Sequence, residues 1–219
     1  MERLIVLDTE TTGLDVDSGH KIIEIGCIEI IGRSITENSF HKYINPQRLI
    51  DEKAYEVHGI SNEDLRDKPI FANIIDEFML YISDSPLIIH NAPFDLGFLK
   101  SEYVQCNHDH TSLENSREII DTLKIARKAS PGKRNTLDAL CSRYSVDNTD
   151  RSLHGALLDA QLLANVYLRM TQGQTFIEGL TETHVHKNND ENVITENRKA
   201  KIIYANTQEI EEHETYFKN

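Results

Sequence analysis

Apolar and polar residues alternate in short blocks over the first 44 positions, a pattern typical of β-strands joined by turns. The first block is almost continuously apolar and runs into the polar turn at residues 11–13, so it predicts a buried strand. In the second block, the isoleucines and one cysteine share a face, and Glu24 lies on the other. The predicted strands are Leu4–Asp8, Lys21–Ile31 and Ser34–Ile44, in an antiparallel meander.

From residue 70 onward, apolar residues recur every three or four positions, which favours helices with one buried side. The predicted helices are Ile70–Ile82, Phe94–Tyr103, Thr122–Ala129, Thr136–Tyr144 and Gly155–Met170, with a short buried strand at Pro86–His90. Asn135 is the expected N-cap of the fourth helix. The buried stripe of the last helix is expected to be Leu158, Leu162, Val166 and Met170. Strands followed by strand–helix alternation predict an α/β fold, a mixed β-sheet flanked by α-helices.

The character of the chain changes after residue 172. We therefore expect one domain at 1–172, a flexible polar linker at 173–200 and a short apolar segment at 201–219. A linker followed by an apolar element is the pattern of a tethered docking segment. The alternative is a C-terminal end with no role of its own.

Composition narrows the class of protein. Hydrophobic residues make up 39% of the 219 positions, and no run approaches the ~18 apolar residues of a membrane span, so neither a membrane segment nor a signal peptide is expected. Three scattered cysteines indicate reduced thiols in a cytoplasmic setting. Acidic residues outnumber basic ones 36 to 23. A nucleic-acid enzyme of this charge must bind its substrate through a small local surface or rely on a partner protein for binding.

Four carboxylates and one histidine stand where apolar segments begin or end: Asp8, Glu10, Asp95, His154 and Asp159. Clustered carboxylates require compensating positive charge, which Mg²⁺ or Mn²⁺ supplies best. Two such ions can activate water and stabilise a leaving oxygen, so the cluster predicts phosphodiester hydrolysis. Taken singly, each feature has a plainer interpretation: a solvated acidic pair, a turn or cap around Asp95, and an incidental histidine.

The spacing of the last two residues separates their roles. Residues five apart on a helix lie about 140° from each other, so His154 and Asp159 cannot share one helical face. We therefore expect His154 on the loop before the helix and Asp159 within it. A loop histidine with an ordinary pKa near ~6.5 suits a proton acceptor better than a fixed metal ligand.

The runs DTETTG (8–13), HNAPFD (90–95) and HGALLDA (154–160) resemble the three signature motifs of the DnaQ-like 3′–5′ exonucleases, in their histidine-containing (DEDDh) branch. The resemblance covers residues 3–171 and implies an RNase H-like fold with two Mg²⁺ or Mn²⁺ ions. It implies that Asp8, Glu10 and Asp159 hold the first ion and that Asp8 bridges to the second. Asp95 would contribute through water, and His154 would be the general base.

The resemblance also implies contacts with the 3′ terminus of the substrate. Residues expected to bind it are Asp8, Glu10, Thr9, Thr11, His58 and Asp159. For His58, a buried structural role is the alternative. Asp121 resembles a supporting acid near the metals, or else it caps the following helix. Lys133 and Arg134 are expected to touch phosphate or to lie in a solvated turn.

Within this family, the run TLDALCSRYSVDNTDRSLHGALLDAQLLANVYLRMTQGQ (136–174) resembles the proofreading subunits of bacterial DNA polymerase III. That similarity implies removal of mispaired 3′ ends, docking to the polymerase alpha subunit through residues 201–219, and a bacterial cytoplasmic location. A small theta-like accessory subunit and the sliding clamp are further expected partners, although residues 174–177 fit a clamp-binding motif only loosely. Three alternatives remain at this point: a free-standing exoribonuclease or oligoribonuclease, a DNA-repair exonuclease, and a non-catalytic docking subunit.

Overall fold

The fold is centred on a mixed β-sheet, seen in a computed structural model that describes residues 2–149 and 151–172. Its five described strands are β1 (Arg3–Thr11), β2 (Ile22–Ile31), β3 (Ser34–Tyr43), β4 (Leu87–Ile89) and β5 (Ile119–Asp121). They lie in the order β3-β2-β1-β4-β5. The first three strands pair antiparallel, as predicted, whereas β4 runs parallel to β1 and β5 parallel to β4.

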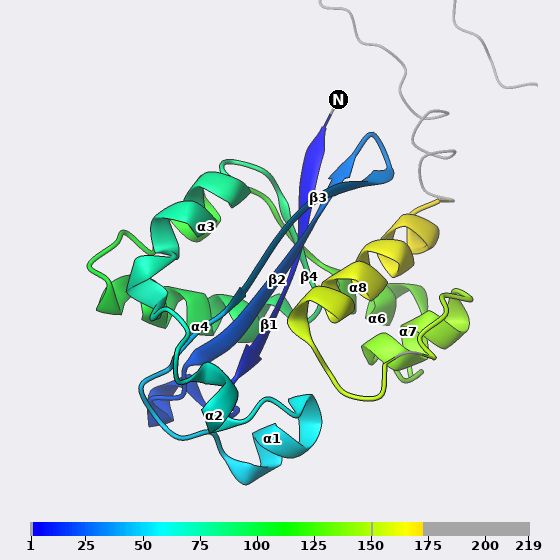
Figure 1. The fold of residues 1–219 in the computed structure, drawn as a ribbon. Coiled ribbons are helices and arrows are strands. Elements are labelled where there is room, and N and C mark those ends of the chain that lie inside the picture. Colours follow the sequence, from blue (N-terminus) through cyan, green and yellow to red (C-terminus); the bar gives the residue numbers. More distant parts are fainter. Residues whose placement is uncertain (1, 150, 173–219) are drawn as a thin grey trace, which may run out of the picture. The chain divides into compact units, whose positions relative to one another are not determined.

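Helices cover both faces of this sheet and one of its ends. They are α1 (Glu52–His58), α2 (Asn62–Leu65), α3 (Ile75–Ile82), α4 (Ala92–Gln105), α5 (Ser112–Asn115), α6 (Thr122–Ala129), α7 (Leu137–Arg143) and α8 (Ala156–Met170). In Figure 1, α3 and α4 lie on one side of the strands and α6, α7 and α8 on the other, while α1 and α2 lie near the C-terminal end of β1. This is the α/β architecture that the sequence predicts.

Each face of the sheet has its own apolar core. Ile5 and Leu7 of β1 pack with the α3 and α4 side, where Phe78 and Leu99 are fully buried. Val6 points to the opposite side and packs with α6, α7 and α8. Side chains along β1 alternate between the two faces of the sheet beyond the core as well. Asp8 and Glu10, two and four residues after Val6, therefore leave the same face as Val6.

Several details of the predicted elements were wrong. The helix expected at 70–82 is divided into a 3₁₀ turn, Phe71–Asn73, and α3. Asn135 is not the N-cap of α7, because the Thr136 side chain accepts the bond from the Ala139 N–H, and Asn135 instead accepts one from Arg143. Leu158 is 37% exposed, whereas Ala156, Asp159 and Ala160 are buried, so Leu158 is not part of the buried face of α8.

Two further predictions concern the C-terminal segments and the absence of a membrane span. The linker at 173–200 and the segment at 201–219 lie outside the described residues. No helix in the described part of the chain has the length and apolar character needed to cross a bilayer.

Candidate active site

Strand β1 delivers two of the predicted carboxylates to the end of the sheet. Asp8 and Glu10 are two residues apart, so both side chains leave the same face of the strand. The ladder with β2 places Asp8 opposite Gly26 and Glu10 opposite Glu24, and its register shifts directly after Glu10. Glu10 is 8% exposed and Asp8 is partly buried. The pair therefore projects from a rigid strand into a partly desolvated space.

Gly26 brings helix α8 against the sheet at this point. A Cβ built on Gly26 would lie 2.2 Å from the Leu157 backbone nitrogen and 2.3 Å from the Ala156 carbonyl carbon. Only glycine permits so close an approach of strand and helix main chains. Asp159, one turn into α8 and 3% exposed, is thereby held near Asp8.

A buried acid fixes the start of α8. The Glu24 carboxylate accepts a hydrogen bond of 3.1 Å from the Ala156 N–H, one of the donors that a helix start leaves unpaired. Its other oxygen lies 2.6 Å from Nε2 of His41. Glu24 is 2% exposed, and Gly155, the N-cap residue, contributes no side chain. The strand thus sets both the position and the capping of the helix that carries Asp159.

Helix α4 supplies the fourth carboxylate. Asp95 lies in its first turn, is 3% exposed and accepts a 2.7 Å hydrogen bond from Thr9 Oγ1. The plainer interpretation of this region made Asn91 a capping residue. Asn91 occupies the N-cap position with φ 67°, but its side chain makes no capping bond. Thr9, expected to contact the substrate, uses its hydroxyl to hold Asp95.

His154 lies on the loop before α8, as its spacing from Asp159 predicts. Its backbone N–H donates to the Val57 carbonyl at 3.1 Å, and Leu153 occupies the space beside Gly59, where a Cβ would come within 2.5 Å. The imidazole is 43% exposed, and its Nδ1 lies 3.4 Å from Asp159 Oδ2. Two contacts with helix α1 thus anchor the loop that presents this histidine.

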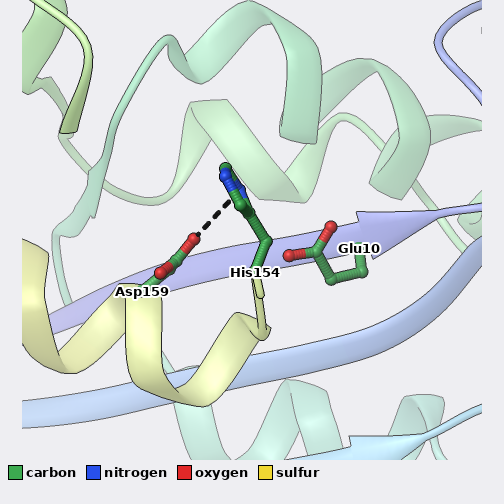
Figure 2. Close-up of side chains that lie close together, drawn as sticks. All are labelled: Glu10, His154 and Asp159. Atoms are coloured by element: carbon green, nitrogen blue, oxygen red, sulfur yellow. Dashed lines mark ion pairs between the residues drawn. The ribbon is translucent and has the colours of Figure 1, made fainter. Parts of the chain in front are cut away.

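Donor atoms of three predicted residues converge. Figure 2 shows Glu10 reaching from β1 toward His154 on its loop and Asp159 on α8. One ligand atom from each lies within 4.8 Å of the others. Across the described ranges, these are the residues whose geometry forms a candidate metal group. Of the expected ligands it contains Glu10 and Asp159 but not Asp8 or Asp95, and it includes His154, which was not expected as a ligand. Asp8 and Asp95 adjoin it, because their charges act on one another and on Glu10.

The electrostatics of the site indicate a deficit of positive charge. Burial, reinforced by the neighbouring carboxylates, raises the pKa of Asp8 well above its ordinary value and that of Glu10 to about 8. Burial also raises the pKa of Asp95 to about 7, against the hydrogen bond from Thr9. The pKa of His154 is lowered, first by burial and then by Arg151. Crowded oxygen donors with raised pKa values fit a divalent cation, which would stabilise their ionised forms.

Arg151 is a member of the site that the sequence did not reveal. Its Nε and Nη2 lie 2.5 and 2.6 Å from the two oxygens of Asp159, and its Nη1 lies 2.6 Å from Asp138 Oδ1. Nη2 is also 2.9 Å from Nδ1 of His154. Its position three residues before His154 was the available signal, but one arginine in a polar loop predicts no particular partner.

A cavity of about 470 Å³ opens beside Glu10. Leu14, Val57 and Phe94 give it an apolar lining, and Thr9, Thr11 and His58 of the predicted substrate-binding set also line it. His58 is 5% exposed; its Nδ1 accepts from the Ile60 N–H, and its buried Nε2 has no hydrogen-bond partner among residues 2–149 and 151–172. The Thr11 hydroxyl donates to the Gly13 carbonyl. The cavity can hold a flat apolar group directly next to the carboxylates.

Three other predicted positions lie in supporting places. The Asp121 carboxylate accepts bonds from the Leu123 and Lys124 N–H groups and so caps α6. Its charge also reaches Asp95. Lys133 and Arg134 are exposed in the turn between α6 and α7. The capping interpretation of Asp121 is confirmed.

Comparison with known proteins gives the site its family. A family model described as Exonuclease matches residues 5–167. The chain belongs to the exonuclease family. This exonuclease is 48% identical to the DNA polymerase III subunit epsilon of Salmonella typhimurium, over 97% of its own length and 91% of that protein. It is 48% identical to the Escherichia coli K12 protein of the same name (97% and 90% covered) and 46% identical to that of Rickettsia felis (98% and 95%).

Solved structures agree with this placement. Exonuclease X in complex with 5′ overhanging duplex DNA aligns with a TM-score of 0.62 and 27% identity, over 78% of this chain and 93% of that one. The zinc-bound form of the E. coli exonuclease I–single-stranded DNA complex aligns with a TM-score of 0.70 and 14% identity, over 82% and 42%, which shows a shared fold. The predicted RNase H-like fold and the resemblance to DnaQ-like exonucleases are confirmed, and divalent-metal dependence belongs to this family.

Proposed function

We propose that this exonuclease is the proofreading subunit of a bacterial DNA polymerase III, which removes mispaired nucleotides from primer 3′ ends as nucleoside 5′-monophosphates. The observation that carries the proposal is the gathering of Glu10, His154 and Asp159 within 4.8 Å, with Asp8 and Asp95 adjoining, beside an apolar cavity. Relatives named DNA polymerase III subunit epsilon over nearly the whole chain support the replicative assignment.

The carboxylates would hold two divalent ions, Mg²⁺ or Mn²⁺. Asp8, Glu10 and Asp159 would share the first, Asp8 would also face the second, and Asp95 would act through a water molecule. When bound, such ions supply a more acidic water and charge neutralisation at the leaving oxygen. Raised pKa values in the metal-free cluster support this assignment, because a cation offsets the cost of ionising acids that burial and mutual repulsion keep protonated.

His154 would accept the proton of the attacking water. Its imidazole is partly exposed, and its loop is fixed to α1 by the bond to Val57, so its ring can reach water without being rigidly packed. A lowered pKa keeps the ring neutral, and able to accept a proton, at neutral pH. The acceptor would be Nε2, because Nδ1 faces Asp159 and Arg151.

The cavity beside Glu10 would receive the terminal nucleoside. Its apolar walls offer surfaces on which any base can stack, which suits an enzyme that must accept all four bases. Thr9, Thr11 and His58 lie along the same cavity and would contact the nucleotide. Preference for a mispaired end then follows from the lower cost of separating it from its template, not from base recognition.

Binding to the polymerase would come from the tail. Residues 201–219 would dock to the alpha subunit, and 173–200 would form the linker. Such a tether raises the local concentration of the enzyme at the primer end to the millimolar range. The net charge of −13 supports this arrangement, since the partner would then hold the duplex. A theta-like subunit, the sliding clamp and a cytoplasmic location complete the proposal.

The test uses the full-length protein and an oligonucleotide that is assayed as a single strand and that, when annealed to its template, has a mismatch at the 3′ end. Hydrolysis from the 3′ end should require Mg²⁺ or Mn²⁺, and Asp8→Asn should abolish it. His154→Ala should retain Mn²⁺ binding while slowing hydrolysis by roughly 10²–10⁴-fold. Equal metal-dependent activity in Asp8→Asn would refute the metal assignment. Deleting residues 173–219 should abolish capture of the polymerase alpha subunit but spare hydrolysis of short single strands.

A further inference from the structure

All three nitrogens of the Arg151 guanidinium make contacts in or beside the candidate site. Its side chain is 5% exposed, although it lies on a loop. Two nitrogens form a bidentate pair with Asp159, a third contacts Asp138, and Nη2 additionally reaches His154 at 2.9 Å. The Asp138 side chain is 56% exposed and lies outside the carboxylate cluster. Arg151 therefore links an acid of the site, the proposed base and an acid at the surface.

The contact with His154 determines which ring nitrogen carries the proton. A guanidinium can only donate hydrogen bonds, so Nδ1 of His154 must accept the bond from Nη2. In a neutral imidazole the hydrogen is then on Nε2. With Nδ1 engaged and Nε2 protonated, neither nitrogen has a free lone pair for a water molecule. This arrangement prevents His154 from acting as a base.

Asp159 faces a second conflict. Both of its oxygens are within 2.6 Å of Arg151, so the carboxylate is already neutralised by a bidentate partner. A divalent cation sharing Asp159 with Glu10 must displace at least part of this pair, because two positive charges would otherwise meet at one carboxylate. Asp138, which already binds Nη1 at 2.6 Å, would keep the guanidinium after its displacement from Asp159.

We propose that Arg151 is an internal latch: it competes with the divalent cation for Asp159 and holds His154 in the tautomer that cannot accept a proton. Release onto Asp138 frees both groups together. Nδ1–H of His154 can then donate to Asp159 Oδ2, now 3.4 Å away, and Nε2 gains a free lone pair. The inference rests on the proposed function, since it takes Asp159 as a metal ligand, and it makes Arg151 a positioning residue that couples metal loading to activation of the base.

The tautomer is measured without metal. Long-range ¹H–¹⁵N spectra of the full-length protein, recorded with chelator in alkaline buffer, should show His154 protonated on Nε2, with its signals identified by their loss in His154→Gln. In Arg151→Gln, the proton should move to Nδ1. A purely structural role for Arg151 would leave the tautomer unchanged.

The competition is measured by Mn²⁺ calorimetry. Arg151→Gln should tighten Mn²⁺ binding by about tenfold, in the usual range for coupled sites. Asp138→Asn is the matched variant with the opposite sign. Asp138 already binds Nη1 and would be the remaining acidic partner of Arg151 after release, so its loss should cost the released arrangement more, and Mn²⁺ should bind more weakly. Because Asp138 is exposed, this variant should fold even if Arg151→Gln proves unstable. Combining the two substitutions should restore the affinity of Arg151→Gln alone.

The outcomes separate the latch from the function beneath it. The metal assignment fails if the wild-type protein does not bind Mn²⁺, or if Asp8→Asn leaves its Mn²⁺ binding intact. If wild type binds Mn²⁺ but Arg151→Gln binds it equally or more weakly, and His154 stays protonated on Nε2, the latch alone is refuted. Tighter binding together with a tautomer change supports it, and unchanged binding in Asp138→Asn would remove the proposed release onto Asp138.

Discussion

Replacing Gly26 with alanine should slow catalysis while leaving the fold intact. The new Cβ would lie 2.2 to 2.4 Å from three backbone atoms of Ala156 and Leu157, whereas real Cβ contacts essentially never fall below 3.0 Å. Helix α8 must therefore move by about 0.8 Å or more, and Asp159 moves with it. A displacement near 1 Å at a reacting centre costs on the order of 10²-fold in rate. Overpacking of this kind costs about 1–3 kcal/mol of stability.

The assay is single-turnover release of the 3′-terminal nucleotide with saturating Mn²⁺, beside thermal unfolding in chelator. Gly97→Ala is the matched control, because a Cβ there meets no atom within 4 Å and lies inside helix α4. That control should be stabilised by about 0.5–1 kcal/mol at full activity. A folded Gly26→Ala protein with the wild-type rate would refute the argument that this glycine sets the separation between Asp8 and Asp159, which we propose to bind metal.

Three further predictions concern the charge and anchoring of the site. In chelator, the raised pKa values of Glu10 (about 8) and Asp95 (about 7) mean that the native state holds protons which the unfolded state releases. Stability should therefore be highest at acidic pH and decline by up to about 1.4 kcal/mol per pH unit and proton from the ordinary pKa values of these acids, 4.5 and 3.8, up to 7–8, and then level off; a melting temperature that rises over that window would contradict it. Asp8→Asn should raise the melting temperature of the protein in chelator, because it removes the carboxyl group that is hardest to ionise. Unchanged or lower stability would count against the raised pKa of Asp8. Gly59→Ala should push Leu153 aside and slow hydrolysis about tenfold, by shifting the histidine loop a fraction of an ångström, and adding Leu153→Ala should recover much of the rate; no recovery would place the defect in the backbone at φ +70° instead.

The longer elements could be predicted because their apolar periodicity repeats. Strands β1 to β3 and helices α4, α6 and α8 each carry several turns or pleats of one pattern. Helices α1, α2 and α5 and strand β5 were missed, since such short elements repeat their pattern too few times to be separated from loops. The equally short β4 and α7 were predicted because a continuous apolar run marks the first and a capping residue the second. The α7 cap was misplaced by one residue because Asn135 and Thr136 are both good capping residues, and only tertiary contacts decide between them.

The candidate site divides in the same way. Acidic residues such as Glu10 can be identified as candidates from the sequence, because a charged group directly after a buried strand calls for a functional explanation. Arg151 does not, since its partners come from α7, α8 and its own loop. The cavity walls were equally hidden: Leu14 is 85% exposed, and nothing in the sequence separates it from any other surface leucine. Contacts between distant segments are the part that one sequence conceals.

Helix α1 has two duties that belong to different steps of the reaction. Val57 and His58 form part of the wall against which the nucleotide would press, and the Val57 carbonyl also anchors the histidine loop. One seven-residue helix therefore contacts both the cavity and the loop that carries His154, the proposed base. An inhibitor that fills the cavity and tilts this helix would disable the enzyme without chelating anything, and that would distinguish it from the metal-binding compounds that act indiscriminately on nucleases.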